Sequence, residues 1–181
     1  MNNYIQIYKN VIDPKYCDEL IKKFENNSQQ YDKQTSFPMS FTQINLNQHN
    51  EWKQDVENLV QVYLKYLKQY KKDCNVTEAM WPTDYAFEQI RLKRYLPDGK
   101  DEFGPHVDAT NLKSSIRFLV FFLYLDDNEQ GQTYFTQLGQ ASPCKKGSLL
   151  MFPPFWPWLH AGTKPIKKPK YILGSYLHYN N

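Results

Sequence analysis

The chain has 181 residues, of which 41% are hydrophobic and 23% charged, and its formal net charge is +3. These values are typical of an ordinary soluble globular protein, and so small a charge gives no argument for nucleic acid or an anionic membrane as a partner. We expect one domain over residues 1–181, with a helical N-terminal part (1–80) and a strand-rich core (86–179). The aromatic fraction of 16% predicts an aromatic-rich core or cleft.

Cysteine usage and apolar runs indicate the cellular setting. Cys17, Cys74 and Cys144 are widely spaced and form neither a CxxC pair nor a disulfide pattern. Residues 1–6 carry neither the basic region nor the apolar region of a secretory signal. The longest apolar run, residues 118–125, has the length of a strand and falls well short of the about 20 residues that cross a bilayer. We therefore expect a cytoplasmic protein in a reducing setting, without membrane segments.

The N-terminal part predicts one short strand and two amphipathic helices. Residues 4–11 alternate as a strand does, and Asp13 followed by Pro14 is typical of a helix start. Asn50 is a candidate cap for a second helix over residues 51–70, whose apolar positions form one stripe. We expect both helices to pack against the outside of the core.

Residues 29–48 show no clear period. They are polar with scattered aromatic residues (Tyr31, Phe37 and Phe41) around Pro38. The pattern predicts a loop or an irregular strand. A plain surface connection and a mobile lid that contacts substrate are both open interpretations.

Period-two patterns follow and predict a sheet. Residues 86–95 alternate as a half-buried strand, whereas residues 116–125 are apolar on both faces, as is typical of a central strand covered on both sides. Further short strands are expected at residues 133–135, 148–152 and 171–179. The spacing of strands and turns predicts an antiparallel sandwich or barrel with two helices outside it.

Two histidines and one aspartate in this part form a candidate metal site. His106 and Asp108 are two residues apart before the central strand, so alternation places both side chains on one face. His160 follows an aromatic segment, residues 156–159. Two imidazoles and one carboxylate are the ligand set of non-haem iron(II), which leaves coordination positions open. A solvated turn pair and a buried structural histidine are the alternative interpretations.

Several motifs, in order, resemble the 2-oxoglutarate- and iron(II)-dependent dioxygenases, and within them the prolyl 4-hydroxylase-like branch. Lys170 lies ten positions after His160 (170 − 160 = 10) and matches the lysine that in this branch pairs with the far carboxylate of 2-oxoglutarate. The resemblance covers residues 86–178, and Gln130 stands where a second glycine is common. The matching motifs are Arg94-Tyr95 with Gly99, His106-Val107-Asp108, Gly131-Gln132-Thr133-Tyr134-Phe135, Lys146 to Phe152, and His160 with Pro165 and Lys170.

The resemblance implies a mainly β fold with flanking helices, namely a double-stranded β-helix (jelly-roll) core with two N-terminal α-helices packed outside. It implies that His106, Asp108 and His160 bind Fe(II) and form the catalytic centre, while Lys170 binds 2-oxoglutarate. Alternation supports this assignment, because Lys170 shares one strand face with Ile172, Gly174, Tyr176 and His178.

Other residues match positions that line the site in related enzymes. Tyr95, Tyr124 and Thr133 are candidate contacts for 2-oxoglutarate, with ordinary core packing as the alternative. Arg91, Trp156 and Trp158 are candidate substrate contacts. For the two tryptophans, the alternative is an extended surface segment whose rings cover the core. Aromatic walls that exclude water are expected from Phe118, Phe122, Tyr124, Phe152 and Trp158.

The implied activity is hydroxylation of a prolyl residue in a peptide or protein, with O2 consumed and 2-oxoglutarate decarboxylated to succinate and CO2. Ascorbate (vitamin C) is a further candidate cofactor. Direct nucleic-acid binding is not expected, since lysines stand where the demethylase branch carries arginines after the distal histidine. Two alternatives are a superfamily dioxygenase with a non-prolyl substrate and a non-catalytic jelly-roll binding module. The oligomeric state is left open.

Overall fold

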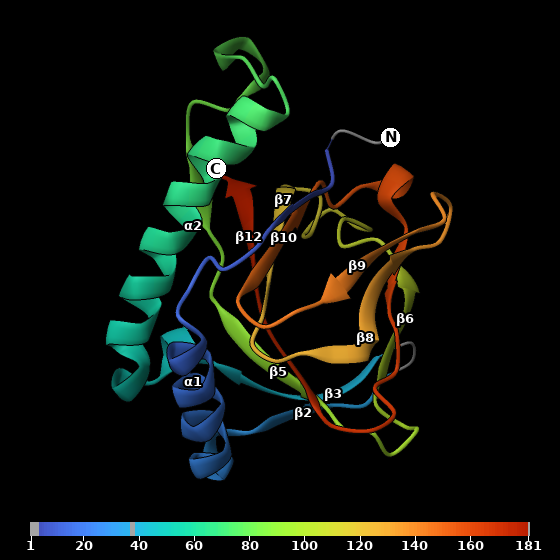
Figure 1. The fold of residues 1–181 in the computed structure, drawn as a ribbon. Helices are drawn as coiled ribbons and strands as arrows, with labels where there is room; N and C mark the ends of the chain where they lie inside the picture. The colour runs from blue at the N-terminus through green and yellow to red at the C-terminus, as the bar shows by residue number, and fades with distance from the viewer. Residues whose placement is uncertain (1–3, 37–38, 181) are drawn as a thin grey trace.

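A computed structural model describes residues 4–36 and 39–180. The two α-helices lie along one side of a curved β-structure (Figure 1). The helices are α1 (Pro14–Asn26) and α2 (Lys53–Asp73). The strands are β1 (Gln6–Tyr8), β2 (Asp32–Gln34), β3 (Met39–Asn45), β4 (Tyr85–Phe87), β5 (Arg91–Tyr95), β6 (Glu102–His106), β7 (Arg117–Tyr124), β8 (Asn128–Phe135), β9 (Gln140–Cys144), β10 (Ser148–Phe152), β11 (His160–Gly162) and β12 (Lys170–Tyr179).

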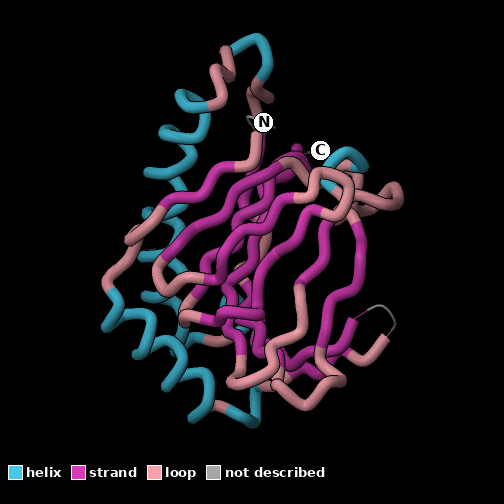
Figure 2. Tube along the Cα trace, turned by 45° about the vertical axis from the view of Figure 1, so that its right-hand side comes forward, coloured by secondary structure: helices cyan, strands magenta, loops and turns pink. Residues whose placement is uncertain are grey.

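The described strands pair in the order β1-β10-β7-β12-β5-β3-β6-β11-β8-β9, and all these pairs are antiparallel. Strand β3 joins one group of strands (β1, β10, β7, β12 and β5) to the other (β6, β11, β8 and β9). Its residues 42–45 pair with β5 and its residues 39–40 pair with β6. The strands thus curve around an enclosed interior, with the helices outside (Figure 2). The predicted jelly-roll core with two outer helices is confirmed.

The central strands have apolar side chains on both faces, as predicted for residues 116–125. One set of β7 side chains packs beneath the helices, and the alternate set points into the space that the strands enclose. Strands β10 and β12 divide their side chains in the same way. On β7 the helix side holds Leu119, Phe121 and Leu123, and the interior side holds Val120, Phe122 and Tyr124.

The start of α1 is as predicted and the start of α2 is not. Asp13 caps α1 by accepting a hydrogen bond from the Lys15 amide over 2.8 Å, and Pro14 is the first helical residue. Asn50 caps nothing, because it opens a 3-10 turn that runs directly into α2 at Lys53. The predicted stripe on α2 is buried at Leu59, Tyr63 and Leu67.

The surface connection considered for residues 29–48 is wrong where β3 lies. Four consecutive residues of β3, from Phe41 to Ile44, are buried, so this strand is covered on both faces. Buried Thr42 and Gln43 hide the usual alternation, since polar residues stand where a sequence pattern expects exposure. Phe37 and Pro38 lie outside the described residues.

Other strands differ in extent from the prediction. Residues 86–95 form two strands, because β4 and β5 pair with different parts of β12. Strand β8 begins at Asn128, five residues earlier than expected (133 − 128 = 5), and the short strands β9 and β11 were not expected. No helix in the described part of the chain is long and apolar enough to span a bilayer.

Candidate active site

Three side chains able to hold a metal ion converge inside the jelly roll. His106 ends β6 and His160 begins β11, and these two residues are paired partners across the two strands. Asp108 follows two residues after His106. Its Oδ1 lies 3.8 Å from Nε2 of His106, and its Oδ2 lies 3.5 Å from Nε2 of His160. All the candidate ligand atoms lie within 4.8 Å of one another, so the predicted convergence is confirmed.

Backbone carbonyls fix the orientation of both imidazoles. Nδ1 of His106 lies 2.8 Å from the Gly104 carbonyl oxygen, and Nδ1 of His160 lies 3.0 Å from the Trp158 carbonyl oxygen. A carbonyl oxygen can only accept, so each Nδ1 carries the hydrogen and donates it. The lone pair of each ring is therefore on Nε2, which is the atom that faces Asp108.

The atoms that face the centre form no hydrogen bond with any residue that the structure describes. Nε2 of His106, Oδ2 of Asp108 and Nε2 of His160 are buried without a hydrogen bond among the described residues. Buried polar atoms are normally paired, because an unpaired one costs about 1–3 kcal/mol. Three unpaired acceptors aimed at one point fit a bound cation. Burial also lowers the pKa of His106 to about 4, which keeps its imidazole neutral and able to bind a metal.

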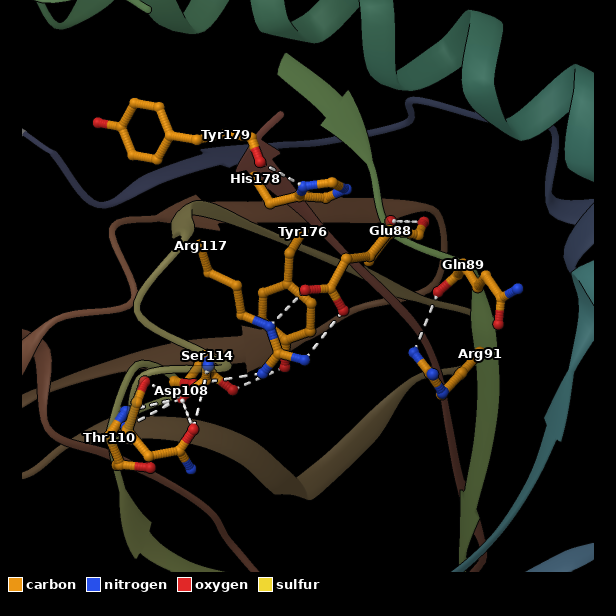
Figure 3. Close-up of polar contacts among 12 residues, drawn as sticks. Glu88, Gln89, Arg91, Asp108, Thr110, Ser114, Arg117, Tyr176, His178 and Tyr179 are labelled. Atoms are coloured by element: carbon orange, nitrogen blue, oxygen red, sulfur yellow. Dashed lines mark hydrogen bonds and ion pairs between the residues drawn. The ribbon is translucent and has the colours of Figure 1, made fainter. Parts of the chain in front are cut away.

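Asp108 lies in the loop after β6 and is held by two residues of neighbouring strands, Arg117 of β7 and Tyr176 of β12 (Figure 3). The Tyr176 phenol donates a 2.6 Å hydrogen bond to Oδ1 of Asp108. The Arg117 guanidinium donates to the Asp108 main-chain carbonyl over 3.2 Å, lies 4.1 Å from the centre of the Tyr176 ring, and pairs with Glu88 at 2.6 and 2.9 Å. Burial and the nearby Asp108 charge raise the pKa of Tyr176 well above its usual value, so the phenol keeps its proton. The sequence placed Tyr176 on the correct strand face but gave no sign of this partner.

Aromatic rings enclose the two histidines. Phe103 stacks on His106 with the ring centres 3.6 Å apart, and Phe152 meets the His160 ring edge-on at 4.8 Å. The ring centre of Phe122 lies 6.2 Å from that of His160, so Phe122 and Phe152 form part of the expected aromatic wall around the site. The expectation for Phe118 is wrong. At the end of β7 it packs against Trp81 on the helix side of the sheet.

Lys170 is buried deeper in the same interior, with 3% of its surface exposed. Its Nζ lies 5.4 Å from the ring centre of Tyr95 and 5.8 Å from that of Tyr124. No carboxylate of the described residues forms an ion pair with it. Burial lowers its pKa to about 8. Within residues 4–36 and 39–180, Lys170 is therefore a buried cation without a counterion.

A small cavity of about 20 Å³ connects Lys170 with the two histidines. Tyr95 and Thr133 line it, as expected for contacts of a bound co-substrate. Tyr124 is not among the lining residues. Its phenol donates a 2.7 Å hydrogen bond to Oγ1 of Thr133, so Tyr124 orients Thr133 from behind.

Gly131 makes room for the stem of Lys170. A Cβ atom at residue 131 would lie 3.0 Å from Cδ of Lys170 and 3.0 Å from Cγ of Asn128, closer than ordinary packing allows. The Asn128 amide in turn donates to the carbonyls of Lys168, over 3.0 Å, and Pro169, over 3.4 Å, just before the lysine. The glycine of the Gly-x-Thr-x-Phe motif thus has a local steric reason in this chain.

A wider cavity of about 440 Å³ opens in front of the metal ligands. Arg91, a candidate substrate contact, lines it together with Lys93, which was not considered as a site residue from the sequence. The two tryptophans do not line it. Trp156 is 79% exposed, and Trp158 lines a separate apolar groove next to Tyr4.

No model of a protein family and no curated protein matches the sequence. Solved structures do match. The viral collagen prolyl hydroxylase of Paramecium Bursaria Chlorella virus-1, in its 2OG complex, has a TM-score of 0.73 at 18% identity, over 98% of this chain and 97% of that one. A Trichoplax adhaerens prolyl hydroxylase in complex with a peptide of the hypoxia inducible factor oxygen degradation domain has a TM-score of 0.74 at 14% identity, over 98% and 84%. The alpha ketoglutarate dependent epimerase SnoN from nogalamycin biosynthesis has a TM-score of 0.69 at 11% identity, over 97% of this chain and 78% of that one.

These similarities define the fold of the chain. It is the fold of the 2-oxoglutarate-dependent oxygenases, as the sequence predicted. Two of the three neighbours are prolyl hydroxylases and the third is an epimerase, so one fold carries more than one reaction.

Proposed function

We propose that the protein is a 2-oxoglutarate- and Fe(II)-dependent dioxygenase. One observation carries the proposal. Three buried acceptor atoms without a hydrogen bond converge, and a small cavity joins them to a buried lysine that has no counterion in the part of the chain that the structure describes. A metal cation would satisfy the acceptors, and a dicarboxylate bound to it would neutralise the lysine.

The chain supplies a binding group for each part of this assembly. His106, Asp108 and His160 would hold Fe(II), and Lys170 would pair with the far carboxylate of 2-oxoglutarate as a point charge. Together, the bound iron and 2-oxoglutarate supply an O2-dependent oxidation coupled to formation of succinate and CO2. A cavity of about 20 Å³ is too small for a diacid, so we expect the flexible Lys170 stem to move when 2-oxoglutarate binds.

The protein's own groups hold the ligands in place and exclude water. The carbonyls behind His106 and His160 and the phenol of Tyr176 fix the three ligand side chains. Phe122 and Phe152 keep water from the centre on the interior side. These contacts need no rearrangement when a metal enters, which favours tight binding.

We further propose that the substrate is a prolyl residue in a peptide or protein. The open cavity in front of the ligands has room for a side chain of an extended peptide. Two structural neighbours are prolyl hydroxylases, one of them with a bound peptide. Because the structural neighbour SnoN is an epimerase, the second candidate is a dioxygenase with a non-prolyl substrate. A non-catalytic binding module is disfavoured, because loss of function would not preserve three ligands and the lysine together.

A turnover assay tests the enzyme class. Protein purified without oxygen is supplied with Fe(II) and 2-oxoglutarate, and succinate is measured after O2 is admitted. We expect succinate from the wild type and none above background from His106→Ala. Absence of turnover in the wild type, with no more iron bound than His106→Ala binds, would contradict the proposal. Mass spectrometry of proline-containing peptides for a gain of one oxygen then tests the substrate.

Other features stay predictions from the sequence. These are a cytoplasmic location, the use of ascorbate, a single domain over the whole chain, and substrate contacts by Trp156 and Trp158.

A further inference from the structure

The cavity in front of the metal ligands is lined by three cations: Arg91, Lys93 and Arg117. Asp108 is the one acidic residue among the described residues that line it, and a bound metal would take its charge. Arg117 is already paired with Glu88 at 2.6 and 2.9 Å. The excess of positive charge in this cavity therefore rests on Arg91 and Lys93.

Among the described residues, neither of these two cations is in a close ion pair, although the Asp108 carboxylate acts on Lys93 from a longer distance. In the described part of the chain, no carboxylate forms an ion pair with Arg91 or Lys93. Arg91 donates one long hydrogen bond, 3.3 Å, to the Gln89 carbonyl. Nζ of Lys93 lies over aromatic rings, 4.9 Å from the centre of Phe41 and 5.7 Å from that of Phe103. Both cations are half-buried, so water replaces the missing partner only in part.

Strand geometry places the two cations in line with the reaction centre. Arg91, Lys93 and Tyr95 share one face of β5, at steps of roughly 7 Å for every second residue. Arg91 lines the outer cavity, Tyr95 lines the inner one, and Lys93 lines both. A group held by Arg91 and Lys93 would thus lie directly beside the substrate atom that faces the metal.

The neighbouring strand β12 has no side chain next to Arg91. Gly174 of β12 is paired with Arg91, and Gly174 lines both cavities. It has no side chain, and a Cβ atom there would already touch the Phe122 ring at 3.5 Å. Both cavities therefore reach the backbone of Gly174 beside Arg91 and Lys93.

We propose that the substrate is an acidic peptide and that Arg91 and Lys93 bind a carboxylate next to the residue that is oxidised. This inference rests on the proposed function and specifies its substrate. A carboxylate between the two cations would supply the missing counterion and form charge-assisted hydrogen bonds, which contribute roughly twice as much as neutral ones. It would also set which residue of the peptide reaches the metal.

Binding without turnover tests the proposal. The wild type is loaded with Zn(II) and 2-oxoglutarate and titrated by calorimetry with three proline-containing peptides of equal length. Their residues flanking the proline are Asp and Glu, Asn and Gln, or Lys. We expect the acidic peptide to bind about tenfold more tightly than the neutral one, with a smaller difference at high salt. The double variant Arg91→Gln/Lys93→Met should bind both peptides equally, whereas Lys33→Gln/Lys100→Gln, which removes two exposed cations elsewhere, should keep the preference.

Four results would overturn the proposal. The first two are equal binding of the acidic and neutral peptides by the wild type, and no binding of any of the three peptides by the wild type. The third is an unchanged preference for the acidic peptide in the Arg91/Lys93 variant. The fourth is binding of a single-stranded oligothymidylate that is tighter than that of the acidic peptide and depends on the same two residues. If Lys93→Met weakened the binding of 2-oxoglutarate but not that of the acidic peptide, the lysine would be assigned to the co-substrate and the proposal would also fail. Failure of the proposed function itself shows separately, as absent succinate release by the iron-loaded wild type.

Discussion

Tyr176 and Asp108 are joined by a buried hydrogen bond of 2.6 Å, although they lie 68 residues apart in the chain. The phenol donates to Oδ1 of the carboxylate, whereas Oδ2 faces His160 at 3.5 Å and accepts no hydrogen bond from any described residue. Tyr176 therefore decides which carboxylate oxygen is available to a metal. We regard it as a positioning residue for the metal ligand.

The first prediction concerns this hydrogen bond. Tyr176→Phe should weaken metal binding by about 10- to 100-fold, as is usual when the partner of a metal ligand is lost. The fold should be kept, because the ring remains in place. Titration with Co(II), followed by calorimetry, measures the change. Tyr179→Phe is the matched control on the same strand, since Tyr179 is 45% exposed. Equal affinities of Tyr176→Phe and the wild type would rule out the positioning role.

A second prediction is that Lys170→Met stabilises the ligand-free protein and removes 2-oxoglutarate binding. Lys170 is buried without a counterion, so its charge costs free energy until a diacid binds. Replacing a buried ion pair with apolar groups of similar volume is often neutral or stabilising by about 1–4 kcal/mol, and we expect stabilisation within this range for the single charge of Lys170. Urea unfolding and 2-oxoglutarate titration measure the two effects. If Lys170→Met instead destabilised the protein and reduced metal binding equally, the lysine would be structural.

The pH dependence of that stabilisation has a definite sign. The pKa of Lys170 is about 8 in the folded protein, against an ordinary value of 10.5. Between these values the unfolded chain binds more protons than the folded one, so the free energy of unfolding of the wild type rises with pH. Lys170→Met lacks this contribution. The excess of its free energy of unfolding over that of the wild type should be fully present below pH 8 and should shrink as the pH rises towards 10.5. Urea unfolding of both proteins at pH 7 and pH 9.5 checks this, and a constant difference would contradict it.

Gly131→Ala should impair 2-oxoglutarate binding and leave the metal site intact. The added methyl group would lie 3.0 Å from Cδ of Lys170, so the lysine stem has to shift. We expect a 2-oxoglutarate requirement raised by about tenfold, equivalent to 1.4 kcal/mol, with an unchanged affinity for Co(II). The exposed neighbour provides the control, Gln130→Ala. Unaltered 2-oxoglutarate binding in Gly131→Ala would show that the stem has slack.

Metal binding should raise the melting temperature. A ligand that binds the folded state alone at 100 times its Kd stabilises by about 2.7 kcal/mol, which in a chain of this size is a shift of roughly 5–10 °C. Melting curves with Mn(II), and with EDTA, measure it. His106→Ala should lose the shift, whereas His49→Ala should keep it, because His49 is outside the candidate site. A shift that survives His106→Ala would place the metal elsewhere.

The sequence predicted the parts of the site that depend on short distances along the chain. His106 and Asp108 are two residues apart, and alternation on β12 correctly assigned Lys170 and Tyr176 to the interior. The central strand β7 was recognisable because it is apolar on both faces.

The parts that were missed depend on contacts between distant segments. The Tyr176–Asp108 hydrogen bond has no local signal. Strand β3 was obscured because polar Thr42 and Gln43 are buried in it, and β11, with three residues, is too short for any period to show. Lys93 could have been found, since it alternates with Arg91 and Tyr95.

The two-sided packing of β12 limits how the length of the chain can change. Lys170 and Tyr176 face the interior, while Leu173 and Leu177 face the helices. Deleting or inserting one residue between Lys170 and Tyr176 would turn one group of these side chains to the wrong face, so the co-substrate lysine and the Asp108 anchor could not both be kept. Exposed surface loops are free of this constraint on side-chain direction. Natural or engineered variation in length should therefore accumulate in the loops, while β12 keeps its residue count.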